Sequence, residues 1–174
     1  GVVLVEAEDA VGNRDRVTGT LTIEGGGVPR VAIVNRAAMI EPSVVPLGGT
    51  LTFTCTVKNE GTVPVRTKGP ESGSEYTNLE NYNTKGEFEE PGLFRVGLDF
   101  EGNSAGRVYP YRWQLGTDEE LTVIDTEIGP QKYLLPGQTV TVVGHLRIVE
   151  ETYKTEPYFW VGLIHEHVAI VQDR

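Results

Sequence analysis

Residues 51–57 alternate between apolar and polar side chains, and this pattern constrains the fold more than any other feature of the sequence. Leu51, Phe53, Cys55 and Val57 share one face, and three threonines occupy the other. A period of two is typical of a strand that is buried on one face only. Nowhere in the sequence do apolar residues recur with helical spacing over three turns, so we expect almost no helix.

Further alternating runs occur along the chain, and turn residues lie between them. Pro136-Gly137 directly precedes the run at 138–142, and proline followed by glycine favours a tight turn. Many short strands separated by turns are typical of a sandwich. We therefore predict an all-β, immunoglobulin-like antiparallel β-sandwich with Greek-key connections and an extra N-terminal β-hairpin. The other expected strands are 31–35, 94–100, 108–115, 121–128, 140–149, 158–164 and 168–171.

The sequence divides into a hairpin, a linker and a sandwich. Residues 1–23 contain two alternating runs around a polar turn, which predicts a β-hairpin. The glycine-rich segment 24–30 is the expected linker, and residues 31–174 are the expected sandwich, with a long irregular loop at 62–92. Because a two-stranded hairpin leaves an apolar face uncovered, another surface must cover it. The candidate assembly residues are Val2, Val3, Leu4, Val5, Leu21 and Ile23.

The composition excludes several classes of partner. The formal net charge is -10 and the pI is near 4.8, so phosphate groups would be repelled and we expect no nucleic-acid partner. No apolar run approaches the roughly 20 residues of a membrane-spanning helix, so we expect no membrane insertion. The single cysteine, Cys55, excludes an internal disulfide, and its place on an apolar face predicts a buried, unreactive thiol.

Two motifs within residues 31–174 resemble those of the bacterial CARDB-like (cell-adhesion-related) immunoglobulin-type domains. They are Pro46-Leu47-Gly48-Gly49-Thr50, which leads into Val57-Lys58-Asn59-Glu60-Gly61-Thr62, and Leu135-Pro136-Gly137-Gln138-Thr139-Val140-Thr141-Val142. Residues 1–23 are similar to the last two strands of a bacterial Ig-like repeat, on the segments Glu6-Ala7-Glu8-Asp9-Ala10-Val11-Gly12-Asn13 and Val17-Thr18-Gly19-Thr20-Leu21-Thr22-Ile23. The resemblance implies an extracellular or cell-surface sandwich with an adhesive or structural role.

Aromatic residues gather in two regions that a carbohydrate-binding module would use. Residues 109–113 place three aromatic side chains on a common strand face, and the loop at 62–92 contains others. Such a face either packs in the core or forms a platform on which sugar rings stack. The candidate binding residues are Tyr76, Tyr82, Tyr109, Tyr111 and Trp113, whereas we expect Trp160 in the core.

No residue pattern specifies a metal, and we predict no cofactor. His165 and His167 lie two residues apart, but the spacing fixes no third ligand, so a polar hairpin tip is the simpler interpretation. Two acidic turns contain oxygen donors suited to calcium, although neither has the spacing of a known calcium loop. These turns contain Asp99, Glu101 and Asn103, and Asp9, Asn13 and Asp15.

The sequence favours a non-enzymatic protein. Serines are few, none lies in a nucleophile elbow, and the one cysteine is expected to be buried. We expect protein partners: adjacent Ig-like domains of a cell-surface stalk, or neighbouring copies joined by N-terminal strand addition in a surface filament. The alternative is a carbohydrate- or protein-binding module that uses the 62–92 loop and the strand at 109–113. Since the sequence begins with glycine, we expect a processed mature chain or an excised fragment.

Overall fold

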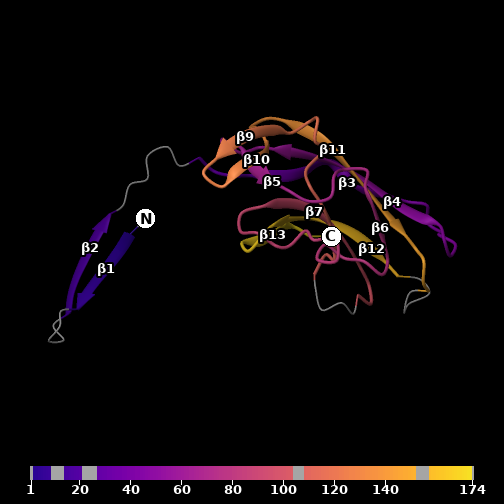
Figure 1. Ribbon diagram of the computed structural model, residues 1–174, viewed down its shortest axis with the longest axis horizontal. Coiled ribbons are helices and arrows are strands. Elements are labelled where there is room, and N and C mark those ends of the chain that lie inside the picture. Colours follow the sequence, from indigo (N-terminus) through magenta and orange to yellow (C-terminus); the bar gives the residue numbers. More distant parts are fainter. Residues whose placement is uncertain (1, 9–13, 21–26, 104–107, 152–156, 174) are drawn as a thin grey trace.

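The protein forms an all-β fold in which two four-stranded sheets lie face to face (Figure 1). The computed structural model describes residues 2–8, 14–20, 27–103, 108–151 and 157–173. Within these ranges no residue is helical, as the absence of helical periodicity predicts. The described part of the chain accordingly contains no helix that is long and apolar enough to cross a membrane.

The first sheet contains the strand predicted at residues 51–57. Leu51, Phe53, Cys55 and Val57 are buried and the threonines between them are half-buried, so the predicted burial pattern is confirmed. This strand pairs antiparallel with β11, in which buried residues also alternate. The strand order in the first sheet is β3 (Val31–Glu41), β4 (Thr50–Asn59), β11 (Thr139–Arg147) and β6 (Glu75–Thr77), with β6 parallel to β11.

The second sheet is covered on both faces along its strand β7. Phe94, Val96 and Leu98 belong to the core between the sheets, as their alternation predicts. On the opposite face Arg95 and Asp99 are buried as well, because loop backbone contacts both side chains. The strand order is β13 (Ala169–Gln172), β12 (Phe159–His165), β7 (Phe94–Phe100) and β8 (Tyr111–Trp113), all antiparallel.

Three aromatic side chains join the two sheets at the centre of the core. Trp113 of β8 contacts Phe53 of β4 and Tyr76 of β6 edge to face, with ring centroids 4.9 Å apart in both pairs. The Trp113 indole also donates a 3.0 Å hydrogen bond from Nε1 to the Ser74 carbonyl. Gly144 of β11 makes room for the cluster, because a Cβ atom there would lie 2.1 Å from Cε1 of Phe53.

Trp160 does not belong to this core, so the sequence-based prediction for it is wrong. The buried core residues of β12 are Val161 and Leu163. Because alternate residues of a strand point to opposite faces, Trp160 lies on the other face of the second sheet. There it is half-buried and stacks against Tyr158, with ring centroids 6.2 Å apart.

A three-stranded sheet packs beside the sandwich, with the strand order β5 (Val65–Thr67), β10 (Gly129–Leu134) and β9 (Thr122–Thr126). Buried Asn59, at the end of β4, links it to the first sheet. The Asn59 amide donates 2.9 Å hydrogen bonds to the carbonyls of Val63 and Leu134, and its Oδ1 accepts one from the Gly61 amide. Asn59 is therefore a junction between the two sheets.

Several expected boundaries need correction. The tract at 62–92 is not wholly irregular, because it contributes β5 and β6, each too short to produce a visible alternation. The strand expected at 108–115 is confined to β8, since Tyr109 has a φ of 53° and cannot continue an extended strand. The strand expected at 121–128 shortens to β9, and its partner β10 was not expected, because it has no clear alternation.

The N-terminal hairpin consists of β1 (Val2–Glu8) and β2 (Arg14–Thr20), which pair antiparallel from Val2 opposite Thr20 to Glu8 opposite Arg14. The structure therefore contains the hairpin expected from the two alternating runs. Among the described strands, neither pairs with any strand of the sandwich, and Figure 1 shows the hairpin standing apart. Two of the candidate assembly residues, Leu21 and Ile23, lie outside the described residues.

Candidate functional site

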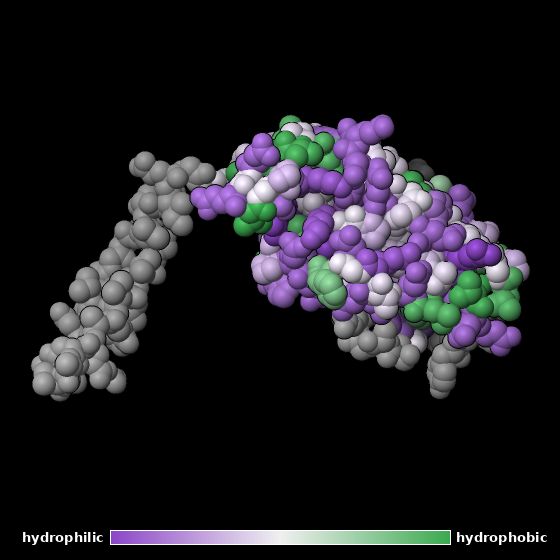
Figure 2. Space-filling view, viewed as in Figure 1, coloured by the Kyte–Doolittle hydropathy of each residue, from purple (hydrophilic) through white to green (hydrophobic). Residues whose placement is uncertain are grey.

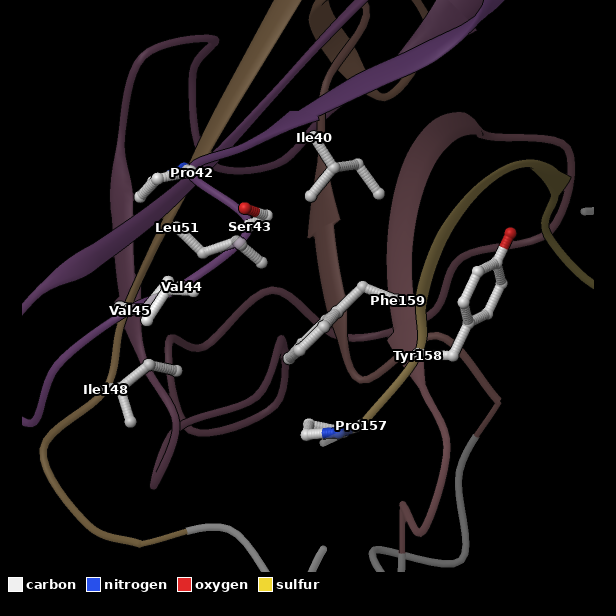
Figure 3. Close-up of a pocket in the computed structure, with 10 residues that line it drawn as sticks. All are labelled: Ile40, Pro42, Ser43, Val44, Val45, Leu51, Ile148, Pro157, Tyr158 and Phe159. Atoms are coloured by element: carbon white, nitrogen blue, oxygen red, sulfur yellow. The ribbon is translucent and has the colours of Figure 1, made fainter. Parts of the chain in front are cut away.

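An apolar groove opens at one end of the sandwich, between the two sheets (Figure 3). The first sheet contributes Ile40 from β3 and Leu51 from β4, and Ile148 follows directly after β11. The second sheet contributes Phe159 at the start of β12. Figure 3 shows the Phe159 ring pointing from its strand into the space between the labelled side chains. The groove is therefore unfilled space between the sheets rather than a depression on one face.

Residues 42–45 form one wall of the groove, and backbone hydrogen bonds fix the remainder of the same loop, residues 46–49. The Gly49 amide donates to the Pro46 carbonyl at 2.8 Å, and Gly48 has a φ of 84°, as the third position of a type II turn requires. The Gly48 amide donates to the Ile148 carbonyl at 2.6 Å, and the Ile148 amide donates to Gly49 at 2.9 Å. The turn at 46–49 thus anchors the loop to the chain after β11.

The lining of the groove is almost entirely apolar. Ser43 and Tyr158 contribute its side-chain hydroxyl groups, and none of the described lining residues has a charged side chain. The groove has a volume of about 710 Å³, within the range of roughly 300 to 1,000 Å³ that is usual for ligand pockets. Its described lining contains no carboxyl, imidazole, amine or thiol group. The groove can bury an apolar occupant, and each Å² of apolar surface removed from water contributes roughly 25 cal/mol to the free energy of binding.

The rim extends this apolar surface onto the outside of the molecule. Val44 and Leu47 of the wall loop are 80% and 64% exposed, and Tyr158 on the other side is 67% exposed. Figure 2 shows one group of apolar residues at the right-hand end of the sandwich. Contiguous exposed apolar surface is typical of interaction sites.

A buried cluster of charges lies on the outer face of the second sheet. Both carboxylate oxygens of Glu166 lie 2.8 Å from Nη1 of Arg112, and Oε1 lies 3.4 Å from Nη1 of Arg95. All three side chains are almost completely buried. Burial lowers the pKa of Arg95, and the Glu166 carboxylate opposes this shift. Arg95 also donates hydrogen bonds to the backbone carbonyls of residues 68, 87 and 88.

Tyr82 and Glu89 extend the cluster into the loop at 62–92. The Tyr82 hydroxyl donates a 2.6 Å hydrogen bond to Oε1 of Glu89, and this bond lowers the pKa of the Glu89 carboxyl. The Arg112 guanidinium lies 4.0 Å above the centroid of the Tyr82 ring and 3.0 Å from Glu89 Oε1. The cluster therefore holds the loop at 62–92 against the outer face of the second sheet through contacts between opposite charges.

The five aromatic residues predicted to bind a ligand are all buried. Tyr76, Tyr82, Tyr109, Tyr111 and Trp113 are at most 2% exposed. Tyr76, Tyr111 and Trp113 belong to the core between the sheets, whereas Tyr109 packs on Gly162 and Tyr82 lies under Arg112. None of the five presents an exposed ring face, so in the described structure these rings pack in the interior rather than form the platform that was the other interpretation.

The histidines do not converge on a metal site. The His165 ring stacks on Phe94 with centroids 4.1 Å apart, and burial lowers the pKa of His165. His167 has a φ of 60° in the β12–β13 turn, and its Nε2 lies 3.8 Å from Glu89. Among the described residues, no three histidine, cysteine or acidic side chains form a group able to hold a metal ion.

The acidic turn after β7 has a structural arrangement. Oδ1 of Asp99 accepts hydrogen bonds from the Phe100 amide and the Asn103 side chain, both at 2.8 Å, and Oδ2 accepts one from the Tyr109 amide at 2.9 Å. Both carboxylate oxygens therefore hold the turn together, and Glu101 is exposed. Of the second acidic group, Asp9 and Asn13 lie outside the described residues, and Asp15 pairs with Ala7 in the hairpin.

The groove was not anticipated from the sequence. Four of its residues, at positions 40, 51, 148 and 159, come from segments that only the tertiary fold brings together. One local signal was present: Val44-Val45 is apolar although it lies in the connection between two strands.

The candidate assembly residues Val2–Val5 form the first half of β1, opposite Val17–Thr20. No family model, curated protein or solved structure matches this chain.

Proposed function

We propose that this protein is a non-enzymatic, extracellular structural or adhesive module of the immunoglobulin-like type, whose N-terminal hairpin is covered by another protein surface. One observation carries the proposal: among the described strands, β1 and β2 pair only with each other. A two-stranded hairpin in water is at best marginally stable, because nothing covers its faces. A neighbouring copy or an adjacent domain would supply that cover.

The strand order supports the immunoglobulin-like part of the proposal. The runs β3-β4-β11 and β13-β12-β7-β8 match the A-B-E and G-F-C-C′ orders of immunoglobulin-like sheets. The departure is β6, which occupies the edge beside β11 but runs parallel to it. The resemblance of residues 46–62 and 135–142 to CARDB-like domains favours the same architecture and an adhesive role at the cell surface.

The chemistry of the described side chains is consistent with a non-enzymatic role. The buried charges of Arg95, Arg112 and Glu166 are paired with one another, and the described lining of the groove contains no carboxyl, imidazole, amine or thiol group. Burial raises the pKa of the Cys55 thiol to about 12, which removes it as a nucleophile at neutral pH. The features left for function are surfaces: the hairpin and the apolar end of the sandwich.

The experiment compares the full chain with a chain that lacks residues 1–26. Sedimentation of the full chain over a range of concentrations is expected to show association, and the truncated chain is expected to remain a monomer with an unchanged melting temperature. If both chains are monomeric and the truncation lowers the melting temperature, the hairpin packs on its own sandwich and the proposal fails.

A further inference from the structure

Two features of this chain have no partner among the residues that the structure describes. The β1–β2 hairpin pairs with no described strand of the sandwich, and the groove between the sheets has no described side chain filling it. Both are apolar in sequence: β1 begins with Val2-Val3-Leu4-Val5, and the groove is lined mostly by aliphatic and aromatic residues. The hairpin could therefore fill the groove, and the groove could cover the apolar residues of the hairpin.

The pattern of β1 suits a space that has two walls. Because alternate residues of a strand belong to opposite faces, four consecutive apolar residues leave neither face polar. Such runs are typical of strands that are covered on both sides. The groove has this geometry, since Ile40 and Leu51 belong to the first sheet and Phe159 to the second.

The positions of the two features favour a partner molecule. The chain leading from the hairpin is fixed to the sandwich at Val28, whose amide donates to Thr62 Oγ1 and whose carbonyl accepts from the Thr62 amide. The groove lies at the other end of β3, at Ile40. The strand between these ends spans about 30 Å, at roughly 3.3 Å per residue. A contact between the hairpin of one copy and the groove of the next would be head to tail and would leave free ends for further copies.

We propose that the groove receives the apolar first half of β1, Val2–Val5, from a second copy of this chain. This proposal rests on the proposed function, because it assumes that the hairpin is covered by a neighbouring protein. It adds that the neighbour is a second copy of the chain and that the covering surface is the groove. The occupant is a strand rather than a small molecule, because the groove has few polar groups to orient a small ligand and opens onto the exposed side chains of Val44 and Tyr158.

A cross-linking experiment between two singly substituted chains tests the assignment. One chain contains Val5→Cys in β1, and the other contains Ser43→Cys, an exposed position at the groove. Cys55 does not compete, because it is buried. After mixing and mild oxidation, a disulfide-linked heterodimer of these two chains is expected. The matched control replaces Ser43→Cys by Glu127→Cys, which is exposed in the β9–β10 turn outside the groove, and is expected to give at least tenfold less cross-link.

A charge placed at the groove provides the second measurement. Ser43→Glu is expected to weaken association of the full chain at least tenfold, because the carboxylate would be buried beside an apolar strand. Ser43→Ala, at the same position, is expected to associate as the unchanged chain does. Both variants are expected to keep the melting temperature of the truncated monomer when they are made in the chain that lacks residues 1–26.

The outcomes separate the two proposals. If the full chain does not associate, the proposed function fails and this assignment fails with it. If the full chain associates through its hairpin but Ser43→Glu has no effect and the two cross-links are equal, the hairpin is covered elsewhere and only the groove assignment is overturned. The assignment also fails if an apolar fluorescent dye binds the groove equally well in the associated full chain and in the truncated chain, because an occupied groove should exclude the dye.

Discussion

At the scale of single residues, Cys55 shows how burial controls chemistry. Its side chain lies in the core between the sheets, and burial raises its pKa to about 12. We predict that a thiol reagent at pH 8 modifies the folded protein only as fast as the chain unfolds. In denaturant one thiol per chain should react at once. Immediate reaction of the native protein would show that the core around Cys55 is open.

Gly144 is a second residue whose role is set by its neighbours. An added Cβ atom would lie 2.1 Å from Phe53 and 2.8 Å from Trp113, so the aromatic core would have to move. We predict that Gly144→Ala lowers the free energy of unfolding by about 1 to 3 kcal/mol, as is usual for overpacking. Combined with Phe53→Leu, the loss should be smaller than the sum of the two single losses. Strict additivity in denaturant titrations would contradict this account.

At the scale of elements, Glu166 joins the β12–β13 turn to β7 and β8. Without its charge, Arg95 and Arg112 would lose the buried carboxylate that they share. We predict that Glu166→Gln lowers the free energy of unfolding by about 3 to 5 kcal/mol, as is found when a buried ion pair loses one partner. The control is Glu60→Gln, which breaks the exposed ion pair with Arg30 and should cost less than about 1 kcal/mol. Equal losses of stability in the two variants would show that the buried cluster of Arg95, Arg112 and Glu166 does not stabilise the fold more than an exposed ion pair does.

The same cluster predicts a pH dependence of stability. The hydrogen bond from Tyr82 holds the pKa of Glu89 below the usual 4.5, so folding favours the ionised carboxylate. The resulting stabilisation is complete above about pH 4.5 and is lost as the pH falls through the lowered pKa. Glu89→Gln should therefore be destabilised less steeply than the unchanged protein between pH 4.5 and pH 3 in thermal unfolding. A parallel pH profile for the two proteins would contradict the assignment.

An element could be predicted from the sequence where a local pattern of apolar and polar residues defines it, and could not where only tertiary contacts do. β4 was predictable because Leu51 to Val57 form a long, regular alternation. β5, β6 and β8 are three residues each, too short for a pattern to define. Tyr111 and Trp113 share the core face, as predicted, but the prediction that Tyr109 shares it is wrong, because its φ of 53° ends the extended strand and the ring packs on Gly162 instead. The outer face of β7 is covered by loops from distant segments, and no local pattern could predict that cover. The groove depends on positions far apart in sequence, so no local pattern could predict it.

At the scale of the whole molecule, charge opposes the association that apolar surface favours. Copies with a formal net charge of -10 repel one another, and salt screens this repulsion over about 10 Å at 0.1 M. We therefore predict that raising the salt concentration from 0.05 to 0.5 M strengthens association of the full chain. Association that weakens over this range in sedimentation would point to contacts between opposite charges and away from an apolar strand in an apolar groove.

The central claim is that the hairpin of one copy is covered by the next copy. The most direct measurement is light scattering combined with negative-stain microscopy on the same purified sample of the full chain. The account predicts a mass that rises with concentration and linear assemblies of repeating sandwiches, with neither observed for the chain that lacks residues 1–26. A monodisperse monomer at all concentrations would contradict the claim.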